Sequence, residues 1–229
     1  MGLYIEIRIR ADMDTLWERT QEPAQHQRWD LRFTEIHRLP GAPDAPQSFR
    51  YATRVLPFVT VAGTGISAGE RHRAGERVSA LRFASPHPLS LLKEGSGYWR
   101  YVPAGDGVRF LTGYDYRPRW GRFGRIADRV VFRPLMGWAT AWSFDRLRLW
   151  CERDIGPGRS LAFALAESGA RLAAVSAAAV YAPPAAAVAV AAAALVLPPS
   201  PVTPAARRCL RTPPPRTAPP ALLATLESA

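Results

Sequence analysis

A few ionisable side chains in this sequence could take part in acid–base chemistry. General acid–base catalysis needs such a group held in an apolar site within reach of a substrate. Three of the four histidines fall in turns or at a strand end, and the fourth belongs to a short helical segment. The candidates are His26, Glu94, Tyr114 and Tyr116. A surface position or a structural hydrogen bond is the simpler explanation for each of them, and no Ser/His/Asp set is evident.

Aromatic and hydroxyl side chains recur with a period of two in several segments and could line a pocket. Alternate residues of a strand share one face of a sheet, so Phe110, Thr112 and Tyr114 point to the same side. A pocket for a planar or hydrophobic ligand is lined by such residues, and a hydrophobic core without a cavity is the alternative. The expected ligand-binding residues are Tyr51, Trp99, Tyr101, Phe110, Thr112, Tyr114, Trp138 and Trp142.

Two acidic residues lie among apolar neighbours and are expected to be paired with arginines. Asp30 and Arg32 flank Leu31, which favours a local ion pair over a catalytic role. Asp145 is expected to pair with an arginine such as Arg148 or Arg50.

Metal, disulfide and cofactor sites are not indicated. Cys151 and Cys209 lie far apart, and the sequence has neither a CxxC pair nor a His/Cys spacing typical of zinc. The segments Gly63-Thr64-Gly65 and Gly95-Ser96-Gly97 fall in strand patterns, where glycine marks bulges or curvature. We therefore expect no metal and no cofactor.

The elements that must position these residues begin with a strand and two short helices. Residues 3–10 alternate between apolar and polar side chains, which is typical of a half-buried strand. Asp12 offers an N-cap for a short helix, and Pro23 restarts the chain as a second one. Strand patterns separated by turn residues follow, and their short links predict an antiparallel meander. They cover residues 31–39, 47–56, 58–69, 75–84, 93–102 and 107–117.

A long helical stretch, 121–154, closes this series. Pro134 removes a backbone donor inside the stretch, so a kink is expected just before it. Trp138 and Trp142 are expected on the face toward the sheet. A single helix held by a curved sheet commonly leaves a cavity between the two, and we expect one here.

The composition changes completely after Gly158. No charged residue occurs between Arg171 and Arg207, and this stretch is mostly alanine and valine, interrupted by Pro183-Pro184. A kinked single membrane span over roughly 172–197 and an Ala/Pro-rich disordered segment are both compatible with it. The expected organisation is a domain over 1–156, an apolar segment and candidate membrane span over 157–199, and a Pro-rich disordered tail over 200–229.

The 30 basic and 19 acidic residues give a formal net charge of +11 without a compact basic cluster. A generally basic surface is therefore favoured over a nucleic-acid site. The N-terminus MGLYIEIRIR has a strand pattern and lacks the apolar core of a signal peptide. We expect no nucleic-acid partner and a cytoplasmic domain, attached to the inner face of the cell membrane if residues 172–197 enter it.

Three parts of the sequence carry a resemblance to a known superfamily: LYIEIRIRADMDTLWERTQEPAQHQRWDLRFTEI at 3–36, GSGYWRYV at 95–102 and the helix from Gly121. Over residues 1–154 the chain resembles the SRPBCC, or START-like, superfamily (polyketide cyclase/dehydrase-like proteins), and most of all uncharacterised bacterial members with WDLRF and GYWRY segments. The resemblance implies an α+β helix-grip fold, in which a curved antiparallel sheet of about seven strands wraps around a long C-terminal helix. This superfold hosts lipid carriers, cyclases, hydroxylase subunits and regulators, and some relatives carry a membrane domain behind the grip domain.

Three functions are compatible with these features. The first is binding of a small hydrophobic or aromatic ligand in a cavity between sheet and helix, without catalytic machinery. The second is a polyketide cyclase/dehydratase-type enzyme, in which Tyr114, Tyr116 or Glu94 assists proton transfer. The third is a membrane-tethered accessory protein whose C-terminal segment holds the pocket at a bilayer.

Overall fold

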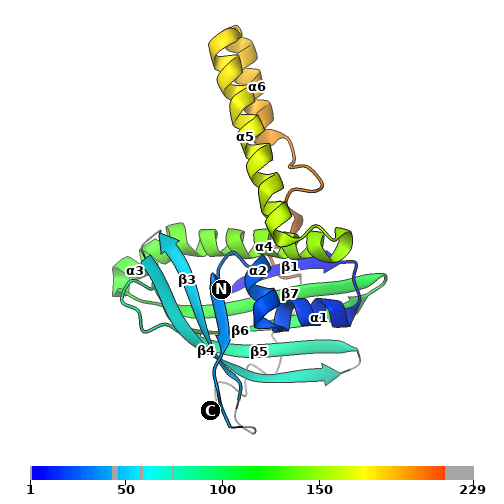
Figure 1. The fold of residues 1–229 in the computed structure, drawn as a ribbon. Helices are drawn as coiled ribbons and strands as arrows, with labels where there is room; N and C mark the ends of the chain where they lie inside the picture. Colours follow the sequence, from blue (N-terminus) through cyan, green and yellow to red (C-terminus); the bar gives the residue numbers. More distant parts are fainter. Residues whose placement is uncertain (1, 43–45, 57–58, 74, 215–229) are drawn as a thin grey trace.

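The computed structural model describes residues 2–42, 46–56, 59–73 and 75–214. One antiparallel sheet packs against helices to form a domain, and two further helices project away from it (Figure 1). The sheet order is β1-β7-β6-β5-β4-β3-β2, so the strands from β2 onward form a consecutive meander that β1 closes beside β7. The strands are β1 (Leu3–Ile9), β2 (Glu35–Arg38), β3 (Ser48–Leu56), β4 (Val59–Arg73), β5 (Glu76–Ala84), β6 (Leu92–Ala104) and β7 (Gly107–Pro118). The predicted α+β fold with its antiparallel meander is confirmed.

Two short helices, α1 (Met13–Gln21) and α2 (Pro23–Trp29), connect β1 to β2. The carboxylate of Asp12 accepts a hydrogen bond from the backbone N–H of Thr15 at 2.7 Å, which satisfies a free donor at the start of α1. Pro23 begins α2, where a missing N–H costs least. Both helices form where the sequence predicts them.

The predicted long helix consists of three segments: α3 (Gly121–Ala127), the π-helical turn η1 (Asp128–Phe132) and α4 (Arg133–Arg153). A π-helical turn interrupts the regular hydrogen-bond ladder and is a common cause of kinks. Pro134 lies in the first turn of α4. The expected interruption therefore occurs in the turn immediately before Pro134.

The core fills one end of the space between the sheet and α4. Tyr101, Phe110 and Phe144 are fully buried there, together with Trp29 from α2. The rings of Phe110 and Phe144 stack with their centroids 4.5 Å apart, which joins β7 to α4. Buried aromatic and aliphatic side chains thus form the hydrophobic core at this end of the grip.

The helices α5 (Pro157–Tyr181) and α6 (Pro184–Val196) form an antiparallel hairpin that stands on the domain near the C-terminal end of α4 (Figure 1). The side chain of Arg171 in α5 donates to the carbonyl oxygen of Leu197 at 2.9 Å, so the two ends of the segment 172–197 lie side by side. In the structure residues 172–197 therefore form two antiparallel helical segments, neither one kinked helix nor a disordered segment. The reason is Pro183-Pro184, which ends one helix and starts another that runs in the opposite direction.

After α6 the chain returns to the domain. Leu210 exchanges both backbone hydrogen bonds with Glu6 of β1, at 2.9 Å each, and covers part of the free edge of the sheet. Cys209 is buried in the core, with its sulfur 3.2 Å from the carbonyl oxygen of Ala141. The expectation of disorder from residue 200 is wrong for this stretch, because a few small apolar residues between the prolines fit against β1 and α4. Residues 215–229 of the expected tail lie outside the described part of the chain.

Asp145 fastens this returning segment to α4. Its carboxylate is fully buried and accepts hydrogen bonds from Arg148 at 2.6 Å, from Arg208 at 2.7 Å and from the backbone N–H of Ala205 at 2.8 Å. The pairing with Arg148 is one of the two that the sequence predicts. Arg208 lies 63 residues further along the chain, and no spacing rule would have predicted its contact with Asp145.

Replacing Asp145 by asparagine should destabilise the protein by about 3 kcal/mol, because Arg148 and Arg208 then lose the buried carboxylate that they share. Denaturant unfolding of the full chain measures the effect. The matched control is Asp106→Asn, which breaks the exposed pair between Asp106 and Arg8 and should cost less than about 1 kcal/mol. Equal losses for the two variants would show that Asp145 does not hold the returning segment.

Candidate functional site

A cavity of about 250 Å³ lies at the other end of the grip, between the sheet, the α1–α2 pair and the start of α4. Its wall is mainly apolar and aromatic, with a small number of polar groups, as is typical of sites for small molecules. The wall includes Phe33, Ile36, Phe49, Tyr51, Leu81, Phe83, Leu92, Tyr98, Trp99, Tyr114 and Met136, with Thr20, Gln21, His26, Arg32, Arg38, Gln47, Ser67, Glu70, Ser79 and Thr112 as polar members.

Four of the expected ligand-binding residues border this cavity: Tyr51, Trp99, Thr112 and Tyr114. Tyr101 and Phe110 do not, although they lie on the same faces of β6 and β7. The hydroxyl of Tyr101 is 2.6 Å from Thr20 Oγ1 and accepts a hydrogen bond from Gln21 Nε2 at 2.8 Å, which fixes the ring in the core. The period of two identifies the inward face of each strand but not the point where the core ends and the cavity begins.

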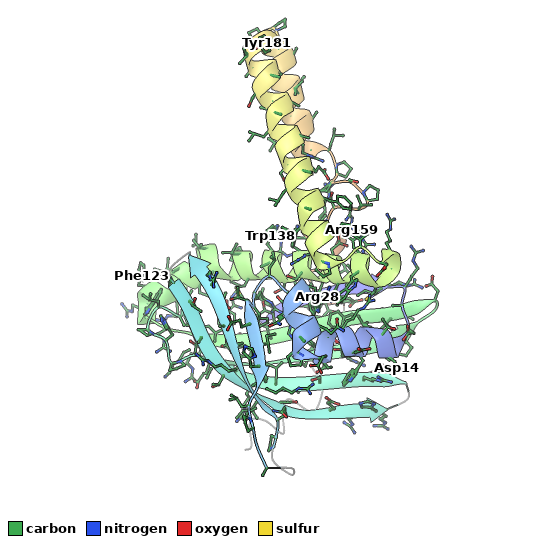
Figure 2. All side chains as sticks on the ribbon, viewed as in Figure 1. Asp14, Arg28, Phe123, Trp138, Arg159 and Tyr181 are labelled. Atoms are coloured by element: carbon green, nitrogen blue, oxygen red, sulfur yellow. The ribbon has the colours of Figure 1, made fainter. Side chains whose placement is uncertain are left out.

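Trp138 and Trp142 do not line the cavity, contrary to expectation. They stack one helical turn apart, with ring centroids 6.2 Å apart, and Trp138 is 45% exposed. Figure 2 shows Trp138 on the outer side of α4, beside the base of the hairpin. The inward stripe consists instead of Met136, Thr140 and Phe144, spaced four residues apart. The physical reason is that a helix covered on several sides can carry tryptophans away from the sheet.

A buried ionic group forms one part of the cavity wall. Asp30 is fully buried and accepts hydrogen bonds from Arg32 Nε at 2.9 Å and from Arg32 Nη2 at 2.6 Å. The ring nitrogen Nε2 of His26 lies 3.1 Å from the same carboxylate. The ion pair predicted for Asp30 and Arg32 is present, and His26 joins it from one turn of α2 away.

The protonation states of Asp30, Arg32 and His26 depend on how closely these side chains lie together. Burial alone would raise the pKa of Asp30, but the charge of Arg32 and the hydrogen bonds from His26 and Arg32 lower it well below the usual range. Burial disfavours the charged form of Arg32, and the adjacent Asp30 more than offsets this, so the pKa of Arg32 is raised. Burial lowers the pKa of His26, although Asp30 acts in the opposite sense. The resulting group is an ion pair beside a neutral imidazole.

Arg32 also faces the ligand space, a role that the sequence did not indicate. Its guanidinium carbon lies 5.3 Å from the ring centre of Phe33 and 5.6 Å from that of Tyr114, and all three residues border the cavity. At these distances both aromatic rings add cation–π attraction to the guanidinium. Arg32 belongs to the WDLRF segment. The local sequence does not show in which direction this segment places the arginine side chain.

The candidate catalytic residues do not form one constellation. His26 and Tyr114 border the cavity, and the hydroxyl of Tyr114 lies 3.0 Å from Thr140 Oγ1. Glu94 is half exposed and pairs with Arg117 at 2.9 Å, away from the cavity. Tyr116 donates a hydrogen bond to the buried Asp128, and burial together with this bond raises the pKa of Tyr116. Among the described residues, no group of three or more His, Cys, Asp or Glu side chains is placed to hold a metal ion.

Comparison with known proteins adds one sequence relative. No protein-family model matches the chain. The uncharacterized membrane protein YndG of Bacillus subtilis (strain 168) is 49% identical over 165 residues, which make up 71% of this chain and 62% of that protein. The chain therefore spans less than two thirds of the length of this relative.

Comparison with solved structures concerns the fold. The di-domain aromatase/cyclase StfQ of the steffimycin biosynthetic pathway has a TM-score of 0.50 at 12% identity, over 67% of this chain and 50% of that one. The Zhui aromatase/cyclase from Streptomyces sp. R1128 has a TM-score of 0.47 at 15% identity, over 66% and 98% of the two chains. The order of elements, the curved sheet and the likeness to StfQ show that the domain has the helix-grip fold. The resemblance to the SRPBCC/START-like superfamily is thus confirmed at the level of the fold.

The lowered pKa of His26 predicts a pH dependence of stability. An unfolded chain takes up the proton near pH 6.5, whereas the folded chain does so only at lower pH, so stability should fall as the pH decreases below about 6.5. The variant His26→Gln keeps a hydrogen-bond donor for Asp30 but does not titrate. Its unfolding free energy should therefore vary less with pH, by up to about 1.4 kcal/mol per pH unit below about pH 6.5.

Denaturant unfolding at a series of pH values measures this difference. His37→Gln is the matched control, because His37 lies on the surface with its side chain exposed. A pH dependence that is the same in wild type and His26→Gln would contradict the prediction.

Proposed function

We propose that the domain binds a small hydrophobic or aromatic ligand in the cavity between the sheet and α4. The observation that carries this proposal is the cavity of about 250 Å³ with its aromatic wall and the Arg32 side chain in that wall. An apolar cavity of roughly 150 Å³ is enough to bind benzene, so this one has room for a larger ring system or a short chain.

The chemistry of Arg32 narrows the class of ligand. Two of its guanidinium N–H groups bind Asp30, and Tyr114 is a further hydrogen-bond partner. A guanidinium has five N–H groups, so donors remain for an oxygen of the ligand. A ligand with one carbonyl, carboxylate or phenolate oxygen would use these donors while its apolar part fills the aromatic space. A hydrogen bond to a charged group in such a site contributes about 1.5–3 kcal/mol.

A cyclase/dehydratase-type enzyme is the second candidate. The observation in its favour is His26, a buried imidazole at the cavity wall that is hydrogen-bonded to Asp30. A neutral imidazole oriented by a carboxylate can act as a general base. The two candidates differ in outcome, because a binding protein returns its ligand chemically unchanged and an enzyme does not. Mass spectrometry of compounds recovered from the purified protein separates them.

The carboxylate preference gives a direct test of the binding proposal. Wild type should bind 2-naphthoate more tightly than naphthalene, and Arg32→Gln should weaken naphthoate binding about tenfold or more while leaving naphthalene binding little changed. Quenching of tryptophan fluorescence, to which Trp99 in the wall contributes, reports binding.

Arg38→Gln is the matched control, because Arg38 also borders the cavity but is exposed and pairs with Glu22 at 3.1 Å. Arg32→Lys keeps the charge beside Asp30 and distinguishes a loss of fold from a loss of the planar donor group. Absence of binding of both compounds to folded wild type would overturn the proposal.

We also propose that residues 157–199 attach the protein to a membrane and that the domain lies on its cytoplasmic side. Helix α5 has 25 residues with a mean hydropathy of 1.3 over its most apolar window, and none of that window is buried within the protein. The relative YndG is named a membrane protein. An exposed apolar surface of this extent usually marks an interaction site.

Deleting residues 172–197 and joining Arg171 to Pro198 through a short Gly–Ser linker should release the protein from membranes into the soluble fraction. The two ends lie close together, with Arg171 Nη2 3.0 Å from the carbonyl oxygen of Pro198, so the linker need not disturb the returning segment. Cell fractionation followed by immunoblotting measures the distribution. If the deletion variant and the full chain distribute alike, the attachment lies elsewhere or does not exist.

A further inference from the structure

The hairpin formed by α5 and α6 presents its apolar side chains outward. Figure 2 shows Tyr181 at the far end of the hairpin, well away from the domain, and Tyr181 is 87% exposed. Leu172, Val188 and Leu195 are also exposed. Both helices are rich in alanine, which lets them pack closely against each other while the larger side chains point away. Such a surface requires an apolar partner.

A cluster of polar contacts ties α5 to the C-terminal end of α6 and the residues after it, and we call it the collar. Arg171 donates to Glu167 at 2.6 Å and to the carbonyl oxygens of Ala194 at 2.6 Å and Leu197 at 2.9 Å. Glu167 in turn accepts from the backbone N–H of Ser200 at 3.0 Å. The collar is electrically neutral, and it satisfies carbonyl groups that the end of α6 would otherwise leave unpaired.

The collar divides the hairpin into two chemically different parts. Beyond it, from residue 172 to the end of α6, there is no charged residue. On the domain side the chain carries Arg159 at the base of α5, which Figure 2 shows close to the domain. On α5 the transition from charged to uncharged chain thus falls at Arg171, opposite the C-terminal end of α6, which carries no charge.

The length beyond the collar matches half of a bilayer. Helix α5 continues for ten residues from Leu172 to its end at Tyr181, which is about 15 Å at 1.5 Å per residue. The hydrocarbon core of a bilayer is about 30 Å thick. The part of the hairpin beyond the collar therefore reaches about the middle of the bilayer and does not cross it.

The turn of the hairpin is suited to an apolar environment. Unpaired backbone N–H groups are costly in hydrocarbon, and Pro183 and Pro184 have none. The N–H of Ala182 binds the carbonyl oxygen of Ala178 at 2.9 Å, and that of Ala187 binds the carbonyl oxygen of Pro183 at 3.0 Å. A turn that emerged in water on the far side of a membrane could keep unpaired N–H groups, because water would bind them.

We infer that the α5–α6 hairpin enters one leaflet of a lipid bilayer as far as the collar and returns to the same side, so that the protein is monotopic. This inference rests on the proposed membrane attachment and adds its depth and topology. The collar lies at the boundary between headgroups and hydrocarbon, and the turn at Pro183-Pro184 lies near the midplane.

Single cysteines placed along the full chain test the depth. Tyr181→Cys, Ser168→Cys and Arg159→Cys put a bimane fluorophore at the turn, at the collar and at the base, and all three positions are exposed. The wild-type chain controls for labelling of Cys209, which is buried, and of Cys151, which is partly buried. The proteins are bound to phosphatidylcholine vesicles that contain phosphatidylglycerol, because the net charge of +11 favours anionic lipid. Thermal unfolding confirms that each variant is folded.

The expected result is flotation of all variants with vesicles, with a blue shift of bimane emission at position 181 and none at 159. A nitroxide in the middle of the lipid chains should quench position 181 most strongly, and a nitroxide on the headgroup should quench position 168 most strongly. Iodide trapped inside the vesicles should quench neither.

Three other results overturn the inference. Quenching of position 181 by trapped iodide means that the hairpin crosses the bilayer, and membrane attachment then stands while the monotopic arrangement fails. A blue shift without vesicles that grows with protein concentration means that a second copy covers the hairpin. Absence of flotation overturns the membrane attachment itself.

Discussion

The path of the chain depends on the hydrogen bonds and ion pairs that the buried carboxylate of Asp145 makes. A charge at this depth is stable only when it is paired, and its partners come from α4 and from the segment that follows the hairpin. Because Arg208 and the N–H of Ala205 must reach Asp145, the chain has to return to the domain after α6. The hairpin is therefore a loop held at both ends, and not a tail held at one.

The same physical constraint shapes the cavity at the opposite end of the grip. Asp30 is as deeply buried as Asp145, and its partners, Arg32 and His26, belong to the same short segment of chain. The partners of Asp30 are local and leave the neighbouring cavity open. Two of the partners of Asp145 belong to the returning segment, which packs against the core. One buried acid thus completes a core, and the other forms the polar part of a cavity wall.

Much of the fold could be predicted from the sequence because its elements depend on local patterns. Alternation along β1, the cap at Asp12 and the turn residues between strands each specify an element within a few residues. The face of α4 that points toward the sheet could not be predicted, because the sheet, α2 and the returning segment cover the helix on several sides. Trp138 and Trp142 resemble an inward stripe in sequence, and only the register of Met136, Thr140 and Phe144 against the sheet decides otherwise.

The cavity itself was harder to locate than the faces that surround it. Tyr101 and Thr112 lie on adjacent strands with inward side chains, yet one is in the core and the other borders the cavity. The difference arises from what packs opposite each residue, and this depends on contacts such as that of Tyr101 with Thr20, which are distant in sequence. Arg32 shows the same limit, since its pairing with Asp30 is local but its position beside Tyr114 is not.

The return of the chain to β1 also bears on aggregation. An open antiparallel sheet has two edge strands, and an uncovered edge can add a strand from another molecule. Leu210 occupies part of the β1 edge, while β2 at the other edge is only four residues long and carries Glu35 and Arg38. Attachment to a surface would concentrate many copies in two dimensions, where an exposed edge is most hazardous. The segment that anchors the hairpin is thus also the one that keeps neighbouring sheets apart.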